Sequence, residues 1–250
     1  MLHKNYSSEN GWSDIFIYNK NIYPRHKKIL VISPHHDDSA VSCGATISAL
    51  SEDNIVNVLV MTAGHHAAIS KLTRQQKIKC REKETVAESK VLGHLARFGN
   101  FKFYDANKKY WSQDLEKFHS IWQRIKPEIV FLPHPHDEHP THFLSTELVL
   151  DYLDRKKIKN TELWHYEGLW SQHLLNSINI VFGFDNKLLG IKNKSIAKHK
   201  SQVKRLPLVK ASQALSRFRA LTLPEQRFVN FGGEPPKIAD YVEAYFRVKY

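Results

Sequence analysis

Apolar, β-branched runs alternate with helical patterns over the first 155 residues, and this alternation constrains the fold more than any other feature. Short runs rich in valine and isoleucine predict buried strands, whereas apolar residues spaced three and four apart predict amphipathic helices. Strands that alternate with helices favour a mainly parallel sheet covered on both faces, the Rossmann-like doubly wound α/β fold. The strands are expected at 27–33, 54–62, 100–105 and 128–133, and the helices at 39–51, 70–92, 114–125 and 141–154.

The length and composition of the whole chain indicate how many domains it forms. A chain of 250 residues without an internal repeat or a flexible linker has the size of one domain. We therefore expect a single domain over 1–250, in which residues 1–26 form an N-terminal extension. The pattern weakens after residue 155, where the expected elements are strands at 161–170, 178–184 and 239–248 and a helix at 195–206.

The formal net charge of +12 raises the question of an anionic partner. The basic residues are spread in short clusters, and no zinc-finger or RNA-binding signature accompanies them. A solvated basic surface is therefore the favoured interpretation, and no nucleic-acid partner is expected. An anionic small molecule stays open as a substrate.

The sequence also carries signals about its compartment. No run of about 18 apolar residues predicts a membrane span. The N-terminal segment lacks the apolar core of a secretory signal. Cys43 and Cys80 have neither the spacing of a metal-binding pair nor the pattern of a disulfide framework. Together these features predict a cytoplasmic chain.

Histidines gather directly after three of the predicted strands. Of 15 histidines, eight lie at 35–36, 65–66 and within 134–142. The carboxyl ends of parallel strands meet at one edge of a sheet, and ligands bind where the strand order reverses. If the first and fourth strands are neighbours, as is usual for doubly wound sheets, "HHDD" (35–38) and "HPTH" (139–142) share one crevice.

Imidazole and carboxylate donors suit a catalytic zinc ion with three protein ligands and an open position for water. "HHDD" can supply a histidine and an aspartate, and "HPTH" a second histidine, which leaves one aspartate as a general base. Simpler explanations exist for each part. A lone histidine after a strand is usually solvated or a cap, Asp38 can serve only as a helix cap, and "HPTH" can arise by chance. The occurrence of both "HHDD" and "HPTH" at equivalent strand ends favours the metal site. For His65 and His66, taken alone, the simpler explanation is favoured.

These segments resemble the PIG-L/LmbE-like family of zinc-dependent N-acetylglucosaminyl deacetylases. "SPHHDD" (33–38) resembles the family motif (A/S)-x-H-P-D-D, and "HPTH" resembles H-P-D-H. The similarity extends from about Lys27 to the C-terminus and implies the Rossmann-like fold. Weaker matches are "TAG" (62–64), "REKETVAESKVLG" (81–93), "WHYEGLW" (164–170), "KSIAKHKSQ" (194–202) and "YVEAYFRV" (241–248).

The resemblance implies a role for each residue of the two motifs. His35, Asp38 and His142 correspond to the zinc ligands, and another divalent metal is an alternative ion. Asp37 corresponds to the general base that activates the metal-bound water. His139 corresponds to the residue that polarises the oxyanion or protonates the leaving amine.

Other positions follow or depart from the family pattern. Arg81 corresponds to the family's substrate-contacting arginine and is expected to bind sugar hydroxyls or a phosphate. His65 stands where many relatives carry an acidic residue near the sugar, which implies a different substrate. Thr141 replaces the aspartate that orients the neighbouring histidine, and Asp137 is a candidate for that supporting role beside His139.

The leading interpretation is a zinc-dependent hydrolase that removes the N-acetyl group from an amino sugar in a glycoside, nucleotide-sugar or glycolipid. The partner is then a small-molecule or glycan substrate, and the oligomeric state, including a homo-oligomer, stays open. A metal-dependent amidase for a different amide conjugate needs the same chemistry and is the first alternative. The second is a basic binding protein with a non-catalytic metal site.

Overall fold

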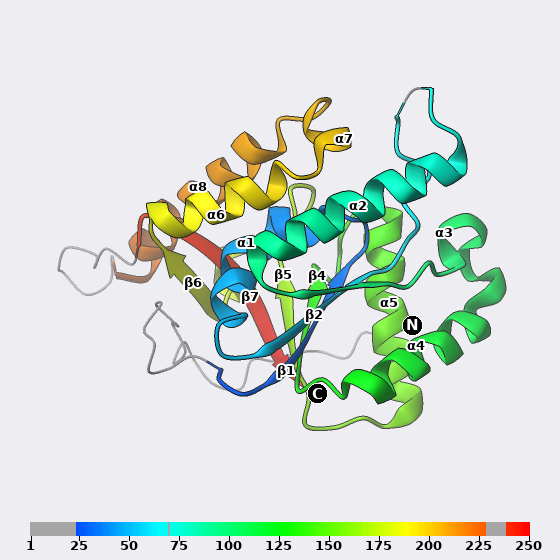
Figure 1. The fold of residues 1–250 in the computed structure, drawn as a ribbon. Helices are drawn as coiled ribbons and strands as arrows, with labels where there is room; N and C mark the ends of the chain where they lie inside the picture. The colour runs from blue at the N-terminus through cyan, green and yellow to red at the C-terminus, as the bar shows by residue number, and fades with distance from the viewer. Residues whose placement is uncertain (1–23, 70, 229–238) are drawn as a thin grey trace.

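The computed structural model describes residues 24–69, 71–228 and 239–250. These residues form one seven-stranded sheet and the helices that cover it (Figure 1). The strand order is β3-β2-β1-β4-β5-β7-β6. Strands β1 to β5 pair in parallel, whereas β7 runs antiparallel to both β5 and β6. The strands are β1 (Lys28–Ser33), β2 (Ile55–Val60), β3 (Leu95–Phe98), β4 (Ile129–Pro133), β5 (Glu162–Tyr166), β6 (Ile180–Phe184) and β7 (Tyr241–Lys249).

Helices cover both faces of this sheet (Figure 1). One face packs against α1, α2, α6 and the start of α8, and the other packs against α4 and α5. Further along α8, Ala220 and Leu223 pack with alternate residues of β6 and β7. This is the expected doubly wound α/β fold. The helices are α1 (Asp38–Leu50), α2 (Arg74–Leu92), α3 (Phe103–Ala106), α4 (Trp111–Ile125), α5 (Pro140–Lys156), α6 (Asn186–Ile196), α7 (Lys200–Val203) and α8 (Leu208–Phe228), with short 3-10 turns η1 (Asn107–Tyr110) and η2 (Leu175–Ser177).

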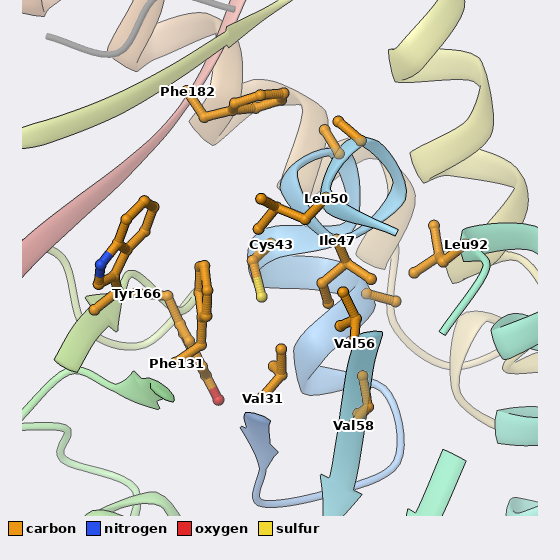
Figure 2. Packing of buried hydrophobic residues seen from close by; sticks show 14 of the residues in the cluster. Val31, Cys43, Ile47, Leu50, Val56, Val58, Leu92, Phe131, Tyr166 and Phe182 are labelled. Atoms are coloured by element: carbon orange, nitrogen blue, oxygen red, sulfur yellow. The ribbon is translucent and has the colours of Figure 1, made fainter. Parts of the chain in front are cut away.

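Alternate side chains of β1 pack into the hydrophobic clusters on opposite faces of the sheet, because successive side chains of a strand point to opposite faces. Val31 belongs to the same buried cluster as the α1 residues Ile47 and Leu50, which Figure 2 shows. Leu30 belongs to the opposite cluster, together with Phe118 of α4. Each such side chain, when fully buried, stabilises the fold by roughly 1.5–3 kcal/mol.

A kink in α1 ties the last strand to the first half of the fold. Cys43 has non-helical angles of φ −133° and ψ 26°, so the helical hydrogen bonding is interrupted there. The backbone N–H groups of Ala45 and Thr46 donate instead to the carboxylate of Glu243 in β7, at 3.0 and 2.8 Å. Lys192 of α6 pairs with the same buried carboxylate at 2.7 Å.

Most strand predictions in the first half are confirmed, and one is wrong. The predicted strand 100–105 is not a strand, because the chain pairs with β2 earlier, at Leu95–Phe98. The segment after it turns into α3, where the Asp114 carboxylate accepts hydrogen bonds from the backbone N–H groups of Lys102 and Phe103.

Two further differences concern the second half and the terminus. The predicted helix 195–206 is wrong, because α6 ends at Ile196 and only the short α7 follows before α8 begins. The strands predicted at 178–184 and 239–248 are confirmed as β6 and β7. Residues 1–23 of the predicted N-terminal extension lie outside the described residues. Among the helices that the structure describes, none is long and apolar enough to cross a membrane.

Candidate metal centre and active site

The two histidine-rich loops meet at the carboxyl edge of the sheet. Strands β1 and β4 are neighbours, with Val31 opposite Phe131, so the loops that follow them lie together. Helix α1 starts at Asp38 directly after the first loop, and α5 starts directly after the second, with His139 as its N-cap. Both loops line one cavity of about 460 Å³, a size typical of small-molecule sites.

His35, Asp38 and His142, here called the deep cluster, bring three candidate ligand atoms together. Asp38 Oδ2 lies 3.1 Å from both His35 Nδ1 and His142 Nε2, and the two nitrogens are 3.3 Å apart. Zinc binds such atoms at about 2.0–2.1 Å in a tetrahedral arrangement, which separates the ligand atoms by roughly 3.3 Å. The three atoms therefore have the spacing that a zinc ion requires.

The far side of the His142 ring has its own carboxylate. Asp137 Oδ2 accepts a hydrogen bond from His142 Nδ1 at 3.0 Å, which leaves Nε2 as the ring atom that faces the deep cluster. The expected support of the His139 ring by Asp137 is not observed. Asp137 Oδ1 accepts instead from the backbone N–H of His139, at 2.9 Å, and its other oxygen is turned to His142.

Negative charge concentrates around the deep cluster. Burial alone would lower the pKa of His142, but the carboxylates of Asp38 and Asp137 outweigh it and raise that pKa to about 10. The same field that holds a proton on this buried imidazole attracts a divalent cation.

Asp37 lies beside the deep cluster and is paired with Arg81. Arg81 Nη2 of α2 donates to Asp37 Oδ1 at 2.6 Å, and both side chains are largely buried while lining the cavity. This contact with the guanidinium fixes the orientation of the Asp37 carboxylate. The sequence placed Arg81 near the substrate but did not predict its contact with Asp37.

His139 lines the cavity next to the deep cluster. Its ring stacks on His142 with centroids 4.6 Å apart, and its Nδ1 accepts the backbone N–H of Thr141 at 3.3 Å. Burial lowers the pKa of His139, so the ring is neutral near neutral pH. Because Nδ1 is an acceptor, the neutral ring carries its proton on Nε2 and can donate it.

The mouth of the cavity contains residues that the sequence did not single out for function. Tyr104 and the 58% exposed Trp170 both line it. His65 does not reach the cavity, because its ring is buried and turned toward Asp105, whereas His66 lines the wall. The paired histidines were a visible signal, but Asp105 was hidden in a segment predicted as a strand.

A comparison with known protein families identifies the family that these motifs match. Residues 30–153, which include both ligand-bearing loops, match the family PIG-L, described as GlcNAc-PI de-N-acetylase. The chain belongs to the PIG-L family.

Relatives of this PIG-L chain carry different names. A glucosamine-6-phosphate deaminase-like protein of Bacteroides thetaiotaomicron is 23% identical over 247 residues, covering 74% of this chain and 37% of that protein. The diacetylchitobiose deacetylase of Thermococcus kodakarensis is 28% identical over 131 residues, covering 49% of each protein. The chain thus spans less than half the length of the curated relatives it matches.

Solved structures share the fold of the PIG-L chain. The N,N'-diacetylchitobiose deacetylase from Pyrococcus horikoshii superposes with a TM-score of 0.66 at 22% identity. The match covers 89% of this chain and 84% of that chain. At this identity the comparison establishes the α/β architecture, and the chemistry must be argued from the site.

Proposed function

We propose that the chain is a zinc-dependent N-deacetylase that acts on an N-acetylated amino sugar. The observation that carries the proposal is the triangle of His35 Nδ1, Asp38 Oδ2 and His142 Nε2, with atoms 3.1 to 3.3 Å apart on the wall of a cavity. Asp37 and His139 line the same cavity and supply the groups that amide hydrolysis needs.

An amide is a weak electrophile with a poor leaving group, so its hydrolysis needs three contributions. Zinc bound by the deep cluster supplies Lewis-acid polarisation and a water that is acidic near neutral pH. Asp37 takes a proton from the attacking water as the new C–O bond forms. The C–N bond then breaks, the amine nitrogen gains the proton held by Asp37, and acetate and a primary amine are released.

His139 has the form required to stabilise the developing oxyanion. Its neutral ring holds a proton on Nε2, through which it donates a hydrogen bond to that oxygen. Arg81 is a positioning residue in this scheme, because it fixes Asp37 through the 2.6 Å ion pair. It also lines the cavity, where it is available to substrate hydroxyls or a phosphate.

The proposed substrate is an amino sugar, because aromatic side chains at the cavity mouth suit a sugar ring. Tyr104 and Trp170 both line the cavity and offer apolar faces for stacking. The names of the deacetylase relatives support the same class. A different amide conjugate would use the same catalytic groups, and the assay below distinguishes such a substrate from an amino sugar.

The test is release of primary amine from a panel of N-acetylated compounds. The panel contains N-acetylglucosamine, its glycosides, a nucleotide-sugar and an inositol-linked form, each with zinc-loaded and chelator-stripped protein. We expect amine release that disappears on chelation and returns with zinc. If protein with zinc bound at the deep cluster releases no amine from any compound of the panel, these sugars are excluded as substrates. The proposed substrate would then be a different amide.

A further inference from the structure

A second group of candidate metal ligands lies beside the same cavity, and one of its members, His66, lines the cavity wall. His65 Nε2 and His66 Nε2 both approach Asp105 Oδ1, at 2.8 and 2.9 Å, and the two rings are 4.3 Å apart. We call His65, His66 and Asp105 the rim cluster. We propose that the rim cluster is a second site for a divalent transition metal, separate from the deep cluster.

The backbone holds the two imidazoles in this converging arrangement. Gly64, just before them, has φ +67°, and a Cβ there would lie 2.8 Å from atoms of the His36 ring. Only glycine allows this tight turn, which directs two consecutive histidines to one acceptor. Asp105 approaches from α3, whose first turn is anchored by the carboxylate of Asp114.

The donor atoms of the rim cluster indicate which ions it would hold. Each of His65, His66 and Asp105 offers one ligand atom, and these three atoms lie within 4.8 Å of one another. Two imidazoles and a carboxylate favour zinc and similar transition metals over magnesium or calcium.

The rim cluster is expected to bind its ion more weakly than the deep cluster. Ligation through Nε2 moves the ring proton of a histidine to Nδ1. In the deep cluster Nδ1 of His142 donates to Asp137 at 3.0 Å. Nδ1 of His65 is buried without a hydrogen-bond partner in the described part of the chain, so the same tautomer leaves an unsatisfied donor.

Arg74 opposes metal binding at the rim. Its Nη2 donates to Asp105 Oδ2 at 2.6 Å from the first residue of α2, while its side chain is largely exposed. A divalent ion on the other oxygen of the same carboxylate is repelled by this guanidinium. Removal of Arg74 should therefore strengthen binding at the rim, an effect that adventitious binding to exposed histidines would not show.

The experiment is equilibrium dialysis of the full chain against buffered zinc. The wild-type protein should bind two ions with separated affinities. Asp105→Asn and His66→Ala should each lose the weaker ion and keep the tighter one, and His142→Ala should lose the tighter ion and keep the weaker. Arg74→Ala should tighten the weaker ion by roughly tenfold.

A matched control is His26→Asn, which removes an exposed imidazole from a residue at φ +57°, a conformation that asparagine tolerates. It should bind two ions like the wild type. A wild-type protein that binds one ion, or a second ion that survives both rim substitutions, would overturn the rim site. Because His142→Ala reports on the deep cluster alone, failure of the proposed deacetylase centre is seen separately.

Discussion

The deep and rim clusters contain the same residue types, two histidines and one aspartate, yet their surroundings differ. In the deep cluster the His142 side chain is 5% exposed, and its far nitrogen is held by an Asp137 side chain that is 1% exposed. In the rim cluster the side chains of His66 and Asp105 are 59% and 41% exposed. Burial and the groups behind the donor atoms, rather than the donor types, therefore distinguish the two clusters.

The two clusters also flank one aromatic residue. The Tyr104 ring centroid lies 6.1 Å from that of His35 and 4.7 Å from that of His66. An ion at the rim would thus share the cavity wall with the proposed catalytic centre. The predictions below test whether chemistry is confined to the deep cluster and its neighbours.

The largest effects are expected in and beside the deep cluster, where different variants separate zinc binding from catalysis. Asp37→Asn should keep zinc near wild-type affinity and lower kcat by about 10²- to 10⁴-fold, because the proton acceptor is lost. His142→Ala should lose the tighter zinc ion and, with it, amine release. Metal content and single-turnover amine release measure the two properties. The reverse pattern would refute the assigned roles.

The next effect tests the carboxylate that distinguishes the deep cluster from the rim. Asp137→Asn removes the charge behind His142, so we expect zinc affinity at the deep cluster to fall roughly 10- to 100-fold. Competition with a chromophoric chelator measures this change. Unaltered affinity would show that Asp137 does not account for the difference between the clusters.

A third prediction concerns buried histidines that have carbonyl partners in place of a carboxylate. Burial lowers the pKa of His165 to about 4 and that of His173 to about 3, and each donates a hydrogen bond to a backbone carbonyl. Both stay neutral in the folded chain, whereas the unfolded chain takes up protons below its ordinary histidine pKa of about 6.5. The free energy of unfolding should therefore fall between pH 7 and pH 5, by roughly a few kcal/mol.

Denaturant unfolding at several pH values measures this loss. The matched variant His165→Gln should reduce the pH dependence, since it removes one of the protonation differences between the folded and unfolded chains. A slope equal to the wild-type slope would contradict the assignment to His165.

The smallest effect is expected at the exposed end of the cavity. Trp170→Ala removes an aromatic face without touching either cluster, so KM should rise by roughly five- to tenfold with little change in kcat. Steady-state kinetics on the best substrate of the panel measures both constants. A large loss of kcat would mean that Trp170 takes part in more than substrate binding.

Much of the fold and of the deep cluster was predictable because the signals are local. The β-branched run of β1 and the helical spacing in α4 each identify an element without knowledge of its neighbours. Parallel strands then bring their carboxyl ends to one edge, which placed residues 35–38 beside residues 139–142. The sequence analysis missed β3, α6 and α8, whose packing against other elements is set by the tertiary structure.

The sequence by itself determined the order of strands and helices in the first half and the positions of the two ligand-bearing motifs. Only the tertiary structure decided that Asp137 supports His142, that Arg81 pairs with Asp37, and that Asp105 completes the rim cluster. The physical reason is the range of the interactions. Periodicity and capping act within a few residues, whereas the partner of a side chain depends on where packing places segments tens of residues apart.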